Sequence, residues 1–295
     1  MNIKKRVVIF GNTKNCAIAN ALLQGRNFEI VGGVVDPIVD KSFQENQRDF
    51  LRRNNLKELN FNTIQSIRPD MGLSIYYSKI IPATVLSGFF VLNLHGGLLP
   101  KWRGLNAGCW AVINGEQEVG YTLHQMDEGL DTGPIFHKFT MRINENEHYA
   151  EVIQKIQKQV IDNINSILAD IIDGKGHPVS QNGEPHIYTT RLKPELGNIT
   201  DWNIKTDYLY NLYRVLGYPY GTGIFFSNKD KMYEITKMSK CKGIVDYIGV
   251  NGGIVLIKGN SVIVKTSDNV ISIDEIKYKD TIVNPESIFR IGQKL

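Results

Sequence analysis

Residues 91–135 read VLNLHGGLLPKWRGLNAGCWAVINGEQEVGYTLHQMDEGLDTGPI and are the most informative stretch of the chain. Asn93 and His95 lie two residues apart at the end of an apolar run, so a strand there directs both side chains to the same side. The glycines and the proline of GGLLPKWRG predict a loop directly after this strand. A second turn-rich segment, DEGLDTG, carries Asp131. The stretch therefore predicts a strand, a loop and a later turn that present polar side chains together.

These side chains suit an attack on a carbonyl group. A side-chain amide such as that of Asn93 can stabilise an oxyanion by donating a hydrogen bond. The imidazole of His95 can move a proton near neutral pH, and a nearby carboxylate such as Asp131 is expected to raise its pKa and fix its ring. Taken singly, these residues would read as a buried histidine and a turn aspartate. Their joint order and spacing favour a catalytic site.

The same stretch resembles the active-site region of the 10-formyltetrahydrofolate-dependent formyltransferases. The family pattern is Asn-x-His, a Ser-Leu-Leu-Pro loop and then Leu-Asp-Thr-Gly, which appears here as Asn93, His95, residues 98–100 and residues 130–133. Gly97 departs from the pattern, because the family usually has Ser there. The resemblance implies an N-formyltransferase with Asn93, His95 and Asp131 as catalytic residues.

The resemblance also implies a donor site. The co-substrate is 10-formyltetrahydrofolate, with no metal, and it is expected between the loop at 78–82 and the segment Met126–Asp131. Backbone atoms of these segments would bind the pterin, with apolar side chains beside it. The candidate residues are Ile80, Ile81, Pro82, Met126, Asp127, Leu130 and Asp131.

The composition is that of an ordinary globular protein with room for two domains. The chain has 295 residues, 42% hydrophobic and 22% charged, with a net charge of +4. That mild basic excess is compatible with an anionic small substrate and gives little support for nucleic-acid binding. Three widely spaced cysteines form no disulfide framework, and the apolar run near the start is too short for a signal peptide. A cytoplasmic protein without membrane spans is expected.

The first half alternates strands with helices. Strands are expected at 7–10, 28–35 and 71–77, helices at 17–23 and 44–58, and a further helix opening at 80–82. An amphipathic helix is expected over 149–172. This order predicts an α/β fold with a Rossmann-like, mostly parallel sheet, whose functional groups gather beyond the carboxyl ends of the strands. The GxGxxG pattern is absent, which disfavours a nicotinamide enzyme.

The second half has a β pattern. Residues 175–199 are rich in glycine, proline and polar residues, and the predicted division is a catalytic domain at 1–185, a linker at 186–205 and a β domain at 206–295. After a helix at 206–216, short strands are expected at 223–226, 232–237, 244–248, 253–258, 261–266 and 270–276. Their spacing predicts a small barrel. This half resembles the OB-like C-terminal domain of methionyl-tRNA and sugar formyltransferases, with residues 218–221 as the turn that opens it.

Comparison among these formyltransferase families limits the choice of the molecule that accepts the formyl group. Methionyl-tRNA enzymes usually carry a basic insertion after the second strand, where this chain has only DPIVDK at 36–41. Glycinamide ribonucleotide enzymes lack the second domain. A nucleotide-linked amino sugar, of the kind built into lipopolysaccharide O-antigen, therefore fits best, with no nucleic-acid partner and with a homodimer expected through the C-terminal half. Candidate residues for its phosphates, its base and the loop beside them are Lys101, Trp102, Arg103, Gly104, Tyr188, Arg191, Tyr218 and Tyr220.

Three alternatives remain open at this point. One is a methionyl-tRNA formyltransferase. Another is a folate- or nucleotide-sugar-binding protein without turnover. The third is a hydrolase that releases formate from the same donor.

Overall fold

The computed structural model describes residues 4–11, 16–241 and 247–295. The chain forms two compact units. The first comprises residues 1–108, 118–141 and 153–190, and the second comprises residues 109–117, 142–152 and 191–295. Two short segments expected in the first domain thus belong to the second unit.

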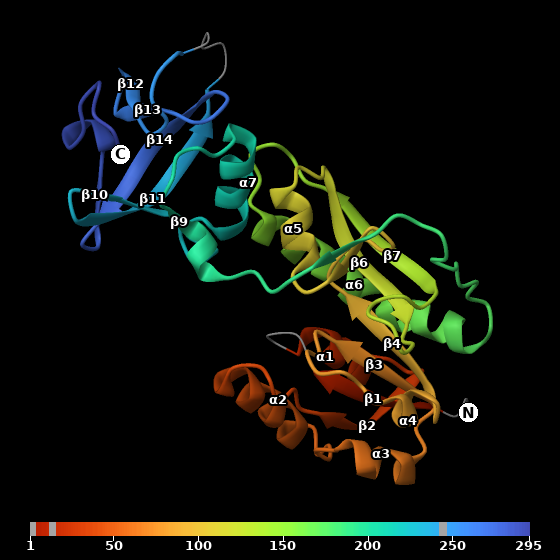
Figure 1. Ribbon diagram of the computed structural model, residues 1–295. Coiled ribbons are helices and arrows are strands. Elements are labelled where there is room, and N and C mark those ends of the chain that lie inside the picture. Colours follow the sequence, from red (N-terminus) through yellow and green to blue (C-terminus); the bar gives the residue numbers. More distant parts are fainter. Residues whose placement is uncertain (1–3, 12–15, 242–246) are drawn as a thin grey trace. The chain divides into compact units, whose positions relative to one another are not determined.

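The first unit contains a six-stranded sheet in the order β2-β1-β3-β4-β6-β7 (Figure 1). Strands β1, β2, β3 and β4 run parallel, and β6 runs antiparallel to β4. Residues 7–11 of β1 are all buried, which requires both faces of the sheet to be covered. The predicted mostly parallel sheet is confirmed. The strand bounds are β1 Lys5–Gly11, β2 Phe28–Val34, β3 Met71–Ile75, β4 Phe90–His95, β6 Glu118–Gln125 and β7 Ile135–Arg142.

Helices cover this sheet. Val8 and Phe10 of β1 belong to an apolar cluster with Ile64 of α3 and Val85 of α4, so these two helices cover one face. Asn165 of α6 donates a hydrogen bond to a backbone carbonyl of α1, which holds those two helices together. The bounds are α1 Ala17–Gln24, α2 Lys41–Arg53, α3 Phe61–Ile67, α4 Ala83–Leu86 and α6 Tyr149–Ile172. Helix α5, Ala107–Ile113, belongs mostly to the second unit.

Local side-chain bonds set the helix ends that the sequence pattern missed. Helix α2 begins earlier than expected because the Asp40 carboxylate accepts a hydrogen bond from the Ser42 N–H. Helix α3 was not expected at all, and a capping box between Asn60 and Thr63 starts it. Seven residues are too few to show a helical period, so only the cap could have revealed it.

The second unit is built on a seven-stranded sheet in the order β12-β13-β14-β11-β10-β9, with β15 on β14. The C-terminal residues link β12, at one end of this sheet, to β10, the strand next to the other end. Ile254 of β12 donates to the Gln293 carbonyl at 2.8 Å, and the Asn228 side chain of β10 donates to the Lys294 carbonyl at 2.8 Å. The sheet therefore curls toward a barrel. The bounds are α7 Thr206–Leu216, β9 Asn198–Ile199, β10 Phe225–Asn228, β11 Lys231–Lys240, β12 Ile254–Lys258, β13 Ser261–Lys265, β14 Val270–Tyr278 and β15 Thr281–Val283, with short 3₁₀ helices at Pro194–Gly197 and Pro285–Ser287.

One expected strand of this unit is not seen. Residues 244–246 of the stretch expected at 244–248 lie outside the described residues, and residues 247 and 248 are not in a strand. The helix expected at 206–216 is present with those bounds.

A two-stranded parallel sheet joins the loop after β4 to the segment after α6. Strand β5 (Trp102–Gly104) pairs with β8 (Ile187–Thr189), although the sequence predicted a loop for the first and a linker for the second. The Ile187 N–H donates to the Lys101 carbonyl at 2.7 Å. Strands of three residues carry no alternating pattern, so their pairing cannot be foreseen from local sequence.

Among the helices of the described chain, none is both long and apolar enough to cross a membrane.

Candidate active site

The site lies at the carboxyl end of β4. Asn93 and His95 alternate with buried leucines along this strand and point to the same side of the sheet. Across the antiparallel pair, Asn93 lies opposite His124 of β6. Strand pairing thus brings together two segments that are about thirty residues apart in the chain.

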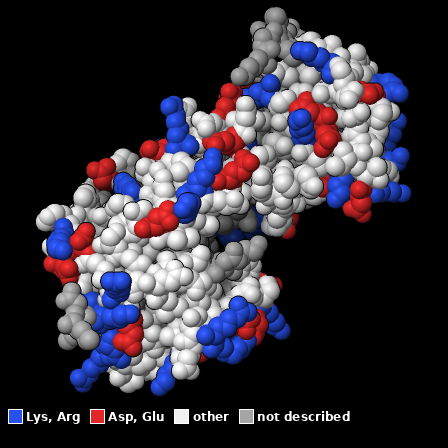
Figure 2. Space-filling model, turned by 180° about the vertical axis from the view of Figure 1, so that it is seen from behind, with Lys and Arg blue, Asp and Glu red and all other residues white. Residues whose placement is uncertain are grey.

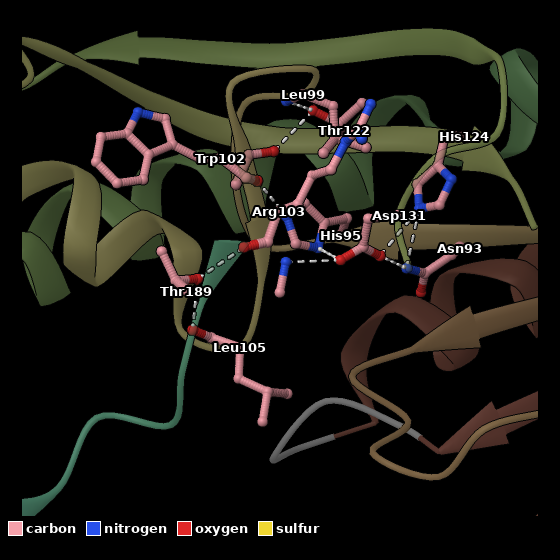
Figure 3. Close-up of polar contacts among 12 residues, drawn as sticks. Asn93, His95, Leu99, Trp102, Arg103, Leu105, Thr122, His124, Asp131 and Thr189 are labelled. Atoms are coloured by element: carbon pink, nitrogen blue, oxygen red, sulfur yellow. Dashed lines mark hydrogen bonds and ion pairs between the residues drawn. The ribbon is translucent and has the colours of Figure 1, made fainter. Parts of the chain in front are cut away.

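Asp131 completes the cluster from the turn between β6 and β7 (Figure 3). One of its carboxylate oxygens, Oδ2, accepts the Gly104 N–H at 2.9 Å and lies 3.4 Å from His95 Nδ1. The other, Oδ1, accepts from Asn93 Nδ2 at 3.4 Å. The structure brings the three predicted catalytic residues together.

The hydrogen bonds of His95 fix its resting tautomer. Its Nε2 lies 2.8 Å from the Trp102 carbonyl oxygen, which can only accept, so Nε2 carries the proton. When the ring is neutral, the lone pair on Nδ1 then faces Asp131. His95 can accept a proton at Nδ1, and the imidazolium that forms is stabilised by the adjacent carboxylate.

The expected direction of the His95 pKa shift is wrong. Burial lowers the pKa of His95 below its ordinary value, and this outweighs the raising effects of the Asp131 carboxylate and the Trp102 carbonyl. The imidazole is therefore neutral at rest, ready to act as a base. The sequence reveals the Asp131 carboxylate, but it does not reveal how deeply the His95 ring is buried, and burial decides the direction of the shift.

His124 is a second histidine in the cluster that the sequence did not reveal. Its Nδ1 donates to the Gln125 carbonyl at 2.8 Å, so Nε2 is free to accept from Asn93 Nδ2 at 3.1 Å. The same Nε2 lies 3.5 Å from the Asp131 carboxylate. Only the β4–β6 register places His124 here, and the alternating run that precedes the DEGLDTG turn was the one available signal.

Asp131 stays ionised between the two imidazoles. Burial alone would raise its pKa, but the adjacent His124 and His95 imidazoles and the hydrogen bond from the Gly104 N–H outweigh burial and lower the pKa of the carboxyl. A buried carboxylate flanked by two imidazoles can absorb the positive charge that an attacking amine develops.

Gly97 is required by the packing of the loop. A Cβ there would lie 2.6 Å from the Ala107 Cβ and 2.9 Å from His95 Nε2. The Thr122 hydroxyl donates to the Gly97 carbonyl at 2.7 Å and fixes the backbone at this point. The family serine has no space beside the histidine in this chain.

The candidate donor-site residues differ in their exposure and in their partners. Ile80 and Leu130 are large apolar side chains that are 87% and 57% exposed. Ile81 is buried in the apolar cluster that contains Val8 and Ile64, and Met126 packs against the same cluster. Pro82 caps α4, and Asp127 accepts the Thr132 hydroxyl at 2.6 Å.

The buried carboxylate of Asp36 holds the loop at 78–82. Asp36, which follows β2, is fully buried and accepts the Ser78 N–H at 2.6 Å and the Ile38 N–H at 2.9 Å. It thereby fixes the start of the loop at 78–82.

The candidate acceptor residues are placed differently from one another. Trp102 and Arg103 are buried, and Arg103 donates to Gln181 and to the Tyr188 hydroxyl. The N–H of Gly104 is held by Asp131. These three residues are buried, whereas Lys101 and Tyr188 are exposed. Arg191, Tyr218 and Tyr220 belong to the second unit.

Within the described chain, no group of three or more histidine, cysteine or acidic residues has the arrangement to hold a metal ion.

Comparison with known proteins identifies the family. The pattern of the formyl transferase family matches residues 7–166, more than half of the chain, and that of the formyl transferase C-terminal domain matches residues 191–291. The chain belongs to the formyl transferase family. The formyl transfer and the two-part fold expected from residues 91–135 and from the β pattern of the second half are thus confirmed.

Relatives of this formyltransferase include enzymes with different acceptors. A methionyl-tRNA formyltransferase from Caldanaerobacter subterraneus subsp. tengcongensis is 32% identical over 236 residues, covering 79% of this chain and 71% of the relative. The structure of WlaRD, a sugar 3N-formyl transferase, matches with a TM-score of 0.68 at 17% identity, over 95% of this chain and 100% of that one. A 4-N formyltransferase from Francisella tularensis matches with a TM-score of 0.62 at 20% identity, over 76% and 93%. These two structures share the fold.

Proposed function

We propose that this formyltransferase moves the formyl group of 10-formyltetrahydrofolate to the amine of a nucleotide-linked amino sugar. The observation that supports the transfer chemistry is the buried cluster in which Asp131 lies within 3.5 Å of Asn93, His95 and His124. Asn93, His95 and Asp131 are its proposed catalytic residues.

Each catalytic residue has a defined task in this proposal. The amine attacks the formyl carbon, a C–N bond forms, and the carbonyl oxygen becomes an oxyanion. The Asn93 amide stabilises that oxyanion by donating a hydrogen bond to it. This bond replaces the long one, 3.4 Å, that Asn93 Nδ2 donates to Asp131 Oδ1 in the free protein. His95 accepts the ammonium proton at Nδ1 beside Asp131. The bond to N10 of the folate then breaks, and N10 takes up a proton, so the transfer leaves no net change in protons.

The donor is proposed to bind at the loop 78–82 and the segment 126–131. Ile80 and Leu130 offer exposed apolar surface to the pterin, while buried Ile81 and partly buried Met126 hold the backbone of these segments. A site with apolar flanks and a few fixed polar groups is typical of small-molecule binding.

The acceptor proposal is supported by the short connection after β2. Strand β2 ends at Val34 and helix α2 begins at Lys41, so residues 35–40 leave no room for a tRNA-binding insertion. On the face in Figure 2, lysine and arginine are interspersed with acidic residues and do not form one basic tract. A small anionic acceptor fits both observations better than a nucleic acid. A homodimer is part of the proposal, to be checked by light scattering.

Methionyl-tRNA is the second candidate acceptor. It is favoured by the 32% identity to a methionyl-tRNA formyltransferase over most of the chain. A tRNA acceptor would require phosphate contacts, which make binding steeply dependent on salt.

One experiment separates the acceptors. The protein and 10-formyltetrahydrofolate are incubated with dTDP-, UDP- and GDP-linked amino sugars, or with charged initiator tRNA, and products are identified by mass spectrometry. The proposal predicts one added formyl group on at least one amino sugar and none on the tRNA. Formylated tRNA with unmodified sugars would establish the second candidate. Formate release without an amine would indicate a hydrolase, and folate binding without any turnover would indicate a binding protein.

A further inference from the structure

The segment after helix α6 is folded onto the catalytic loop. Strand β8 pairs with β5, directly after the loop that follows His95. The Thr189 hydroxyl lies within hydrogen-bond distance of the backbone carbonyls of Arg103 and Leu105, at 2.8 and 2.9 Å (Figure 3). Residues 179–189 span the predicted boundary between the catalytic domain and the linker at 186–205, and they are part of the structure around the site.

Gln181 is the one side chain of this segment that reaches the catalytic turn. It is only 4% exposed. Its Nε2 donates to the backbone carbonyls of Asp131 at 3.1 Å and Gly133 at 2.6 Å. Its Oε1 accepts from Arg103 Nη2 at 3.0 Å. Carbonyls only accept and a guanidinium only donates, so these partners fix the amide orientation.

These contacts matter because the Asp131 backbone needs support. Asp131 has a φ of 55°, a left-handed conformation that is uncommon for residues other than glycine and costs free energy. The Gly104 N–H holds its carboxylate, and Gln181 holds its backbone carbonyl. Gln181 thus contacts the main chain that aims the carboxylate at His95, while touching none of the catalytic side chains.

We propose that Gln181 is a positioning residue for formyl transfer, which acts by holding the Asp131 turn against the Arg103 strand. The proposal rests on the catalytic role proposed for Asp131. It predicts that the effect of removing Gln181 passes through the Asp131 carboxylate.

Two substitutions separate this role from a simple packing role. Gln181→Met keeps the length of the side chain and removes all three hydrogen bonds. Gln181→Glu keeps an acceptor for Arg103 but turns a carboxylate toward the two backbone carbonyls of the turn, which repel it. If Gln181 acts through the turn, both variants are impaired. Asn182→Ala, at an exposed neighbouring position, is the matched control.

The decisive test is a double-mutant cycle with Asp131→Asn. The titration of His95 is followed by NMR on isotopically labelled histidine, assigned with His95→Gln, and turnover is measured in parallel with a pool of dTDP-linked 3-amino and 4-amino sugars. In the wild-type background we expect Gln181→Met and Gln181→Glu to change the pKa of His95 by about 0.5 unit or more. We expect turnover to fall about 10-fold or more, with the affinity for 10-formyltetrahydrofolate kept.

In the Asp131→Asn background, the same substitutions are expected to add no further change. Equal effects in both backgrounds, or wild-type behaviour of both Gln181 variants, would overturn the positioning role alone. Wild-type turnover by Asp131→Asn itself would overturn the proposed role of Asp131, and the role of Gln181 with it. If Gln181→Met does not fold, as judged by its melting temperature, Gln181→Glu carries the cycle.

Discussion

The buried cluster around Asp131 and the Tyr218–Tyr220 turn of the second unit differ in how firmly the protein holds their side chains. His95 is buried, and both of its ring nitrogens face protein partners. Tyr218 is 43% exposed, and Tyr220 is similarly exposed, with a hydroxyl that donates to Glu151. Groups that stabilise developing charge must be oriented before the reaction, whereas groups that bind an acceptor must stay accessible to it. Substitutions in the two regions should therefore damage different steps.

The largest effect is expected at Asn93. Replacing Asn93 with Ala removes the amide that faces the proposed oxyanion, and turnover should fall about 10²- to 10³-fold with the fold intact. Steady-state formyl transfer and circular dichroism measure the two parts of this prediction. Asn163→Ala, which removes an exposed amide from α6, should leave turnover unchanged. Equal turnover rates of the Asn93→Ala and Asn163→Ala variants would contradict the catalytic role of Asn93.

A smaller effect is expected when the family serine is restored at Gly97. The new side chain would meet Ala107 and the His95 ring, so Gly97→Ser should lower stability by about 1–3 kcal/mol and turnover about 10-fold. Chemical denaturation and kinetics measure these effects. Gly249→Ala is a suitable control, because a Cβ there lies 4.0 Å from the nearest atom. A fully active Gly97→Ser protein would show that the loop holds His95 less tightly than its packing indicates.

A still smaller effect, confined to the acceptor, is expected in the second unit. If Tyr218 stacks on the base of the nucleotide, Tyr218→Ala should raise KM for the acceptor about 5- to 10-fold while KM for the folate and kcat stay the same. Exposed Met232 of the same unit gives the control, Met232→Ala. An unchanged KM for the acceptor would show that Tyr218 does not bind the acceptor and that other residues bind its base.

The smallest effect is a pH dependence that distinguishes burial from charge at His95. A base is active when unprotonated, and burial lowers the pKa of His95. The acid limb of kcat/KM should therefore lie below pH about 6.5, the ordinary value for histidine, so activity is retained as the pH falls from 8 to 6.5. A limb above pH 7 would mean that Asp131 outweighs burial, as the sequence alone had suggested.

The sequence predicted those parts of the structure that have a long or local pattern. The period of apolar residues placed α6 at 149–172, and the apolar run before Gly96 placed β4 with Asn93 and His95 on one side. The Leu-Asp-Thr-Gly turn placed Asp131, whose left-handed backbone suits a turn between two glycines.

What the sequence could not give depends on pairing between distant segments. His124 enters the cluster through the antiparallel register of β4 and β6, and Gln181 enters it from a segment fifty residues after Asp131. The alternating run before the DEGLDTG turn suggests a strand at His124 but not its partner strand, and Gln181 has no local pattern at all. The shift of the His95 pKa was predicted in the wrong direction, because it depends on burial, which is also a property of the assembled fold.

The catalytic role of the cluster is tested most directly by one pair of measurements on Asp131→Asn. Single-turnover formyl transfer from 10-formyltetrahydrofolate is measured with the acceptor that the wild-type protein formylates, and folate affinity is measured on the same sample by calorimetry. We predict a rate at least about 100-fold below that of the wild type, with the folate Kd within about twofold. A wild-type rate in the folded variant would contradict the role of this carboxylate and of the cluster built around it.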